Sequence, residues 1–170
     1  MASALIVEVP EAEPAVARHR AWLDASAPFG VPAHVTVLYP FTPPETIDTP
    51  VLARLERLFG QFRRFRYQLD RTSWFGQDVL WLSPSPPGPF RALTEHVCQV
   101  FPAFAPYQGQ FADVIPHLTI GHDHSLDDLR AAEESVQAHL PIDSDATAVT
   151  LITQQSPGTP WAKAATFALA

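Results

Sequence analysis

The sequence predicts an α+β protein built as two lobes, and three observations support this prediction. Eighteen prolines and only seven glycines favour many short elements separated by stiff turns over a helical bundle. A proline-rich stretch at 83–89 lies almost at the midpoint of the 170 residues, and we expect it to be irregular and to link the lobes. Each half around it contains strand patterns and two helix patterns. We therefore expect residues 1–170 to form a single domain of two lobes.

The first half is expected to contain four strands and two helices. The strands follow from alternating or short apolar runs at 4–9, 33–41, 65–69 and 79–82. A hairpin turn is expected at 76–78, between the last two strands. One helix is expected over 11–25, and a second begins at Thr49-Pro50, with threonine as the N-cap and proline in the first turn.

The second half repeats this plan. A helix over 89–101 is predicted from one apolar stripe, formed by Phe90, Leu93, Val97 and Phe101. A strand follows at 114–121, and a second helix opens at Ser125 and stops before Pro141. Two closing strands are expected at 146–154 and 163–169.

Two matching tetrapeptides, one in each half, are the strongest functional signal. They are His34-Val35-Thr36-Val37 and His117-Leu118-Thr119-Ile120. Because side chains alternate along a strand, the apolar pair of each tetrapeptide can pack into a core while histidine and threonine project from the other face. If the two halves are related by an approximate two-fold axis, both pairs face a shared groove.

Two histidines that face one phosphorus atom suit phosphodiester chemistry. A neutral imidazole removes a proton from water or a hydroxyl, and a protonated imidazole donates one to the leaving alkoxide. The hydroxyls of Thr36 and Thr119 can donate hydrogen bonds to the non-bridging oxygens, where negative charge accumulates. This scheme requires neither a metal nor a covalent nucleophile.

The sequence resembles the 2H phosphoesterase superfamily, and within it the 2′-5′ RNA ligase-like and cyclic phosphodiesterase branch. The segment from His34 to Phe41 resembles the first motif of that branch, and Pro116 to Ile120 resembles the second. The resemblance implies two antiparallel sheets around a central groove, with helices on the outside. It also implies action on 2′,3′-cyclic phosphates or 2′-5′ phosphodiesters, with His34, Thr36, His117 and Thr119 as the catalytic set.

Substrate-binding residues are less clearly marked. Many members of that family have a basic residue shortly after the second motif, where this chain has Gly121-His122. His122 would supply a positive charge there only when protonated. Phe41 and Trp74 are candidates for stacking against a base, because one ends the first motif strand and the other lies near a hairpin tip. Asp113 is a candidate for orienting a histidine.

Two other functions stay open. The first is a non-catalytic module that binds an RNA end or a nucleotide, although binding alone would not require two titrating groups. The second is a zinc-dependent hydrolase that uses His117, His122 and His124, since imidazole clusters bind zinc. On a regular strand, however, His122 would point away from His117. We therefore expect no metal site and no cofactor.

Composition restricts the partners and the compartment. A net charge of −7 argues against binding a long duplex nucleic acid, because such affinity grows with the number of phosphates that Lys and Arg neutralise. A single cysteine, Cys98, fits a reducing cytoplasm. The first ten residues lack a basic leader, so we interpret them as a strand and not as a signal peptide. No apolar run is long enough to span a membrane. We expect a cytoplasmic monomer that acts on RNA ends or small nucleotides.

Overall fold

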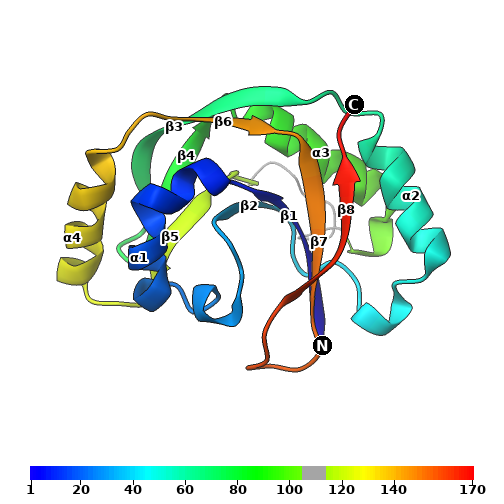
Figure 1. Ribbon diagram of the computed structural model, residues 1–170, viewed down its shortest axis with the longest axis horizontal. Helices are drawn as coiled ribbons and strands as arrows, with labels where there is room; N and C mark the ends of the chain where they lie inside the picture. Colours follow the sequence, from blue (N-terminus) through cyan, green and yellow to red (C-terminus); the bar gives the residue numbers. More distant parts are fainter. Residues whose placement is uncertain (105–113) are drawn as a thin grey trace.

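The computed structural model describes residues 1–104 and 114–170, which form two four-stranded antiparallel sheets flanked by helices (Figure 1). The strands are β1 (Ala2–Glu8), β2 (His34–Leu38), β3 (Phe65–Phe75), β4 (Val79–Ser85), β5 (Leu118–His122), β6 (Ile142–Ala146), β7 (Ala148–Gln154) and β8 (Ala162–Ala168). The helices are α1 (Glu13–Leu23), α2 (Thr49–Phe59), α3 (Gly88–Val100) and α4 (Leu126–Gln137), with short 3-10 turns at Pro10–Ala12, Ala27–Phe29, Pro44–Thr46 and Pro102–Phe104. The predicted α+β fold class is confirmed.

The two sheets do not correspond to the two halves of the sequence. The first sheet has the order β2-β1-β7-β8, and the second has the order β5-β4-β3-β6. The chain passes from the first sheet to the second between β2 and β3. It returns between β6 and β7, where Thr147 is the only residue outside the strands. Each half therefore contributes strands to both sheets.

The prediction that 83–89 is irregular is wrong, whereas its role as a link between lobes stays a prediction. Residues 83–85 are the end of β4, and α3 begins at Gly88. Pro84 is tolerated in β4 because β5 pairs only as far as Leu82, so no neighbour requires a backbone donor from Pro84 on that side. The residues before and after this stretch belong to the same sheet, since β4 pairs with β5. The single two-lobed domain over 1–170 stays a prediction.

One face of each sheet packs against the helices and forms the core. Val7, Val35 and Leu151 of the first sheet are buried together with Leu69 and Leu80 of the second. Helices α2 and α3 contact the first sheet, and α1 and α4 contact the second. In Figure 1, α1 and α4 lie at the left beside β5, and α2 lies at the right beside β8. The opposite face of each sheet is free of these helices and contains the polar side chains of the two motifs.

Helix and strand boundaries differ from the predictions in two places that matter. Helix α2 starts at Thr49, but its N-cap is Asp48, whose carboxylate accepts a hydrogen bond from the Val51 amide at 2.9 Å. Strand β5 starts at Leu118, four residues later than expected. The apolar stripe predicted for α3 is confirmed, because its members are buried. Among the described helices, none combines the length and the apolar character that a membrane span requires.

Candidate active site

The two motifs lie at neighbouring edges of the two sheets. Strand β2 is the edge of the first sheet and β5 is the edge of the second, and the two strands are in contact. The imidazoles are close enough for a charge on His117 to lower the pKa of His34. The structure thus brings together the two histidines that the sequence places in opposite halves.

Alternation along each motif matches the prediction. Val35 and Val37 are buried, whereas His34 and Thr36 are half-buried on the other face. In the same way Leu118 and Ile120 are fully buried and Thr119 is half-buried. The apolar side chains anchor each strand to the core, so the polar ones have a fixed orientation on the open face.

Each motif histidine forms a hydrogen bond with the backbone two residues before it. His34 Nδ1 lies 2.8 Å from the carbonyl oxygen of Pro32, and His117 Nδ1 lies 2.7 Å from that of Ile115. A carbonyl oxygen only accepts hydrogen bonds, so Nδ1 must be the donor in both rings. The neutral form of each ring therefore has its hydrogen on Nδ1, and Nε2 is left with a lone pair that can take a proton.

Burial sets the acidity of both rings. Desolvation lowers the pKa of His34, and the charges of Arg20 and His117 lower it further, while the hydrogen bond to Pro32 and the charge of Asp24 oppose this. Desolvation also lowers the pKa of His117, against the effect of its bond to Ile115. Both imidazoles are consequently easier to deprotonate than a free histidine.

Two aromatic rings surround His117. Phe75 contacts it edge-on with ring centroids 5.1 Å apart, and Trp81 does so at 5.8 Å. Phe75 and Trp81 also stack on each other at 4.7 Å. Trp81 is the cross-strand neighbour of Thr119, so both side chains lie on one face of the sheet. The sequence did not single out these two rings as neighbours of a histidine, because their proximity depends on the pairing of β4 with β5.

A buried ion pair at the C-terminal end of α1 lies near His34. Arg20 and Asp24 are 2 % and 4 % exposed, and Arg20 Nη2 lies 2.8 Å from Asp24 Oδ2. Sequence reasoning missed this pair. Its only signal was an arginine four residues before an aspartate within a helix pattern, a spacing that is also common on solvated helix surfaces.

The structure places neither Phe41 nor Trp74 on the open face, so their predicted role in binding substrate stays a prediction without support from the geometry. Phe41 is only 2 % exposed and packs edge-on against Phe101 and Phe104, so its ring has no face for a ligand. Trp74 pairs with Leu80 on the helix-covered face of the second sheet, and its Nε1 donates to Glu133 of α4 at 2.9 Å. Neither ring lies on the open face.

His122 lies on the open face, contrary to the expectation that it points away from His117. Trp81 pairs with Thr119 and Leu80 with Gly121, so Ile120 is an extra residue in β5. This bulge places His122 opposite Val79, on the same face as Thr119. Its role in substrate binding stays a prediction.

The three histidines proposed for zinc have different neighbours. His122 Nδ1 lies 2.9 Å from Asp123 Oδ2, whereas the ring of His124 packs against Trp22 at 5.7 Å. Within 1–104 and 114–170, no group of three or more His, Cys, Asp or Glu side chains is arranged to hold a metal ion. The described residues therefore give the zinc alternative no support. Asp113 lies outside the described residues.

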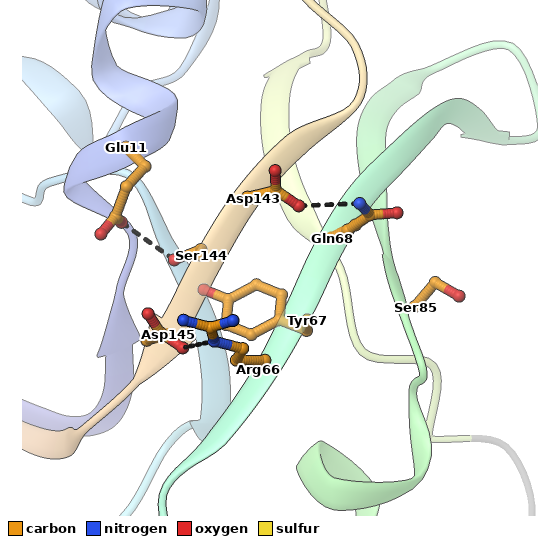
Figure 2. A pocket seen from close by; sticks show the side chains of 8 residues that line it. All are labelled: Glu11, Arg66, Tyr67, Gln68, Ser85, Asp143, Ser144 and Asp145. Carbon is orange, nitrogen blue, oxygen red and sulfur yellow. Dashed lines mark hydrogen bonds and ion pairs between the residues drawn. The ribbon is translucent and has the colours of Figure 1, made fainter.

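A separate pocket of about 630 Å³ opens against β3, β4 and β6 (Figure 2). It is lined by Glu11, Arg66, Tyr67, Gln68, Ser85, Asp143, Ser144 and Asp145. Most of its polar groups bind each other: Ser144 donates to Glu11 at 2.9 Å and Gln68 to Asp143 at 2.7 Å. None of the four motif residues lines this pocket, so the histidine pair, and not the pocket, marks the candidate active site.

Comparisons with known proteins agree with the fold. A family model described as the 2′-5′ RNA ligase superfamily matches residues 8–158. Escherichia coli LigT in complex with 3′-AMP has a similar fold, with a TM-score of 0.65 and 19 % identity over 99 % of this chain and 98 % of that one. A Thermus thermophilus protein has a TM-score of 0.62 and 20 % identity, and a structure described as a phosphoesterase has a TM-score of 0.61 and 18 % identity. Both matches cover 99 % of this chain and 98 % of the other. A search of curated proteins finds no match.

Proposed function

The chain belongs to the 2′-5′ RNA ligase superfamily, and we propose that it is a phosphoesterase that acts on phosphodiesters at the ribose 2′ position. The proposed substrates are 2′,3′-cyclic phosphates or 2′-5′ linkages at RNA ends or in small nucleotides. End joining in the reverse direction would use the same groups, since each proton transfer is reversible.

The matched hydrogen bonds of His34 and His117 are the observation that supports this proposal most directly. With both Nδ1 atoms bound to backbone carbonyls, the two Nε2 atoms are the titrating positions. One neutral Nε2 takes the proton of the attacking water or hydroxyl as its oxygen bonds to phosphorus. The other, protonated, gives its proton to the leaving oxygen as the ester bond breaks. Thus this chain's own residues can perform both transfers.

Thr36 and Thr119 complete the proposed site. Each threonine lies two residues after its histidine on the same strand face. No protein hydrogen bond engages either hydroxyl within the described residues, so each hydroxyl has a hydrogen to donate to a non-bridging oxygen. Such donors stabilise the charge that develops there in the transition state.

Structures of Escherichia coli LigT support a nucleotide as the ligand class. That protein has been solved with 3′-AMP, NADP+, ATP and phosphate. We propose that this chain likewise binds a phosphate next to a ribose, and that His122 adds a positive charge to the groove when it is protonated.

The test is a turnover assay with a panel of phosphodiesters in the presence of a chelator. Purified protein is incubated with 2′,3′-cyclic mononucleotides, with 2′-5′ dinucleotides and with 3′-5′ dinucleotides as the reference. We expect opening of the first or second class, with His34→Ala and His117→Ala each slowed by about 10² to 10⁴-fold. His139→Ala, at an exposed position after α4, is the matched control and should keep wild-type turnover.

Three results would reject the proposal. Full turnover in either motif alanine variant would show that the two-histidine mechanism is wrong. Tight nucleotide binding without product would favour a binding module. Loss of turnover on chelation, restored by zinc, would favour a metal-dependent hydrolase.

A further inference from the structure

Arg20 is held in a fixed geometry inside the protein. Its Nε and Nη2 donate to Asp24 Oδ2 at 3.0 and 2.8 Å, and Asp24 Oδ1 accepts from the amide and hydroxyl of Ser26 at 2.9 and 2.8 Å. The two side chains of the ion pair are 3 % and 4 % exposed, so little water competes for these bonds. A guanidinium in such a fork is far less mobile than a surface arginine.

The third nitrogen of the Arg20 guanidinium contacts the loop that leads into the first motif. Arg20 Nη1 donates to the carbonyl of Val31 at 3.1 Å. A second side chain of α1, Glu13, accepts the amide of Ala33 at 2.7 Å. Arg20 and Glu13 therefore fix the residues on both sides of Pro32, whose carbonyl accepts the hydrogen bond of His34 Nδ1.

The second motif has the same arrangement of hydrogen bonds to two consecutive carbonyls. Arg91 Nε of α3 donates to the carbonyl of Val114 at 3.3 Å, and the next carbonyl, that of Ile115, accepts from His117 Nδ1. In both motifs an arginine holds the carbonyl three residues before the histidine, and the histidine itself binds the one two residues before it. Arg91 is exposed, whereas Arg20 is buried, so the constraint is stronger at His34.

We propose that Arg20 is a positioning residue for His34. By holding the Val31–Ala33 backbone in place, Arg20 keeps the ring hydrogen of His34 on Nδ1 and leaves Nε2 unprotonated in the neutral ring. The catalytic consequence rests on the proposed function; the effect on the ring itself does not. Loss of the arginine fork would let Pro32 move, and His34 could then rotate or exchange its tautomer.

Several other charged groups surround His34, so a test has to keep the net charge around the ring constant. Asp24, the C-cap of α1, acts together with Arg20, and His117 acts from the residue before β5. His122 lies 3.7 Å from Asp24 Oδ1. Glu8, the cross-strand partner of His34 on β1, is paired with Lys163 at 2.9 Å. A useful variant therefore changes the Arg20 geometry without changing the net charge.

Two variants satisfy this condition. Arg20→Lys keeps the charge, but an ammonium cannot reproduce the planar fork that spans Asp24 and Val31. Arg20→Met with Asp24→Asn removes both charges together and leaves no buried ion unpaired. Arg18→Met is the matched control, because Arg18 lies on the same helix and is exposed. Circular dichroism and thermal unfolding verify that each variant is folded.

The decisive readout is the ring tautomer of His34, measured by nitrogen-15 NMR of the imidazole. In the wild type and in Arg18→Met we expect Nδ1 protonated and Nε2 unprotonated in the neutral ring. In either Arg20 variant we expect a substantial Nε2-protonated fraction and a fall in kcat of roughly 100-fold, because a small misplacement of a catalytic group has such an effect. KM should change much less.

Each outcome has one interpretation. A wild-type tautomer and a kcat within about two-fold of wild type in a folded Arg20 variant would overturn the proposal. If the double variant does not fold, Arg20→Lys provides the same NMR test. If the tautomer changes as expected but the wild type turns over no phosphodiester, the positioning role stands and the proposed function fails.

Discussion

A proton on His117 lowers the pKa of His34, across the contact between β2 and β5. Protonation of one ring therefore makes protonation of the second ring less favourable, which disfavours the doubly protonated state. Acid-base catalysis by two histidines requires one neutral and one protonated imidazole.

The pH dependence of kcat/KM should be bell-shaped, with its maximum below pH 6.5, the ordinary histidine pKa. The base works only when neutral, so its lowered pKa moves the acidic limb to lower pH. The acid works only when protonated, so its lowered pKa moves the alkaline limb in the same direction. Initial rates at constant ionic strength between about pH 4 and about pH 9 measure both limbs. A maximum at or above about pH 7 would contradict the lowered pKa values.

Thr36→Val and Thr119→Val should each reduce kcat while the fold is retained. Valine has nearly the shape of threonine but no hydroxyl, so the variant loses one donor to the non-bridging oxygens. Loss of a single donor of this kind costs about 10² to 10³-fold in kcat. Thr153→Val, a half-buried threonine on β7, is the matched control and should keep the wild-type rate. Equal rates in all three variants would exclude the proposed role of the threonines.

Phe75→Ala should raise the pKa of His117 toward its ordinary value. The ring of Phe75 contacts the imidazole at 5.1 Å, and its removal admits water that stabilises the protonated form. Proton NMR titration of the His117 ring in the wild type and in the variant measures this shift directly. An unchanged His117 pKa would show that other residues, such as Trp81, account for the desolvation.

Gly121→Ala should destabilise the protein. A Cβ at this position would lie 2.7 Å from Leu23 Cβ and 2.9 Å from Leu129 Cδ2, so α1 or α4 would have to move. Overpacking of this kind costs about 1–3 kcal/mol of unfolding free energy. Gly88→Ala meets no atom within 4 Å and should have little effect, and chemical denaturation of both variants provides the comparison. Equal stability of the two would mean that the β5 contact with these helices is looser than described.

The strands, the helices and the two motifs were predictable because their signals are local. Alternation around His34 and His117 requires only neighbouring residues, and the helix stripe of α3 likewise follows from its own sequence. The assignment of strands to sheets was not predictable in this way. Strands β1 and β2 pair with each other but share their sheet with β7 and β8, and such distant pairings leave no mark on local composition.

The side chains that lie on another face than expected have a common physical origin. Strand β2 stops at Leu38, so strand alternation no longer determines where Phe41 points, and that ring turns into the core. In β5 the extra residue Ile120 reverses the face on which His122 lies. Trp74 was selected because it lies near a hairpin turn in the sequence. Its cross-strand pairing with Leu80, however, places it on the helix-covered face of the sheet. Bulges and cross-strand partners are tertiary properties.

The single residue between β6 and β7 limits how the two sheets can move. Thr147 alone joins Ala146 of one sheet to Ala148 of the other, and its carbonyl accepts the amide of Leu169 at 2.9 Å. A hinge needs several unpaired residues to absorb a rotation, and this connection has none to spare. This connection therefore restricts rotation of one sheet against the other, and the contact between β2 and β5 adds to that restraint. Binding should incur little ordering entropy, and the protein should discriminate ligands by the distance between their phosphate and the groups around it.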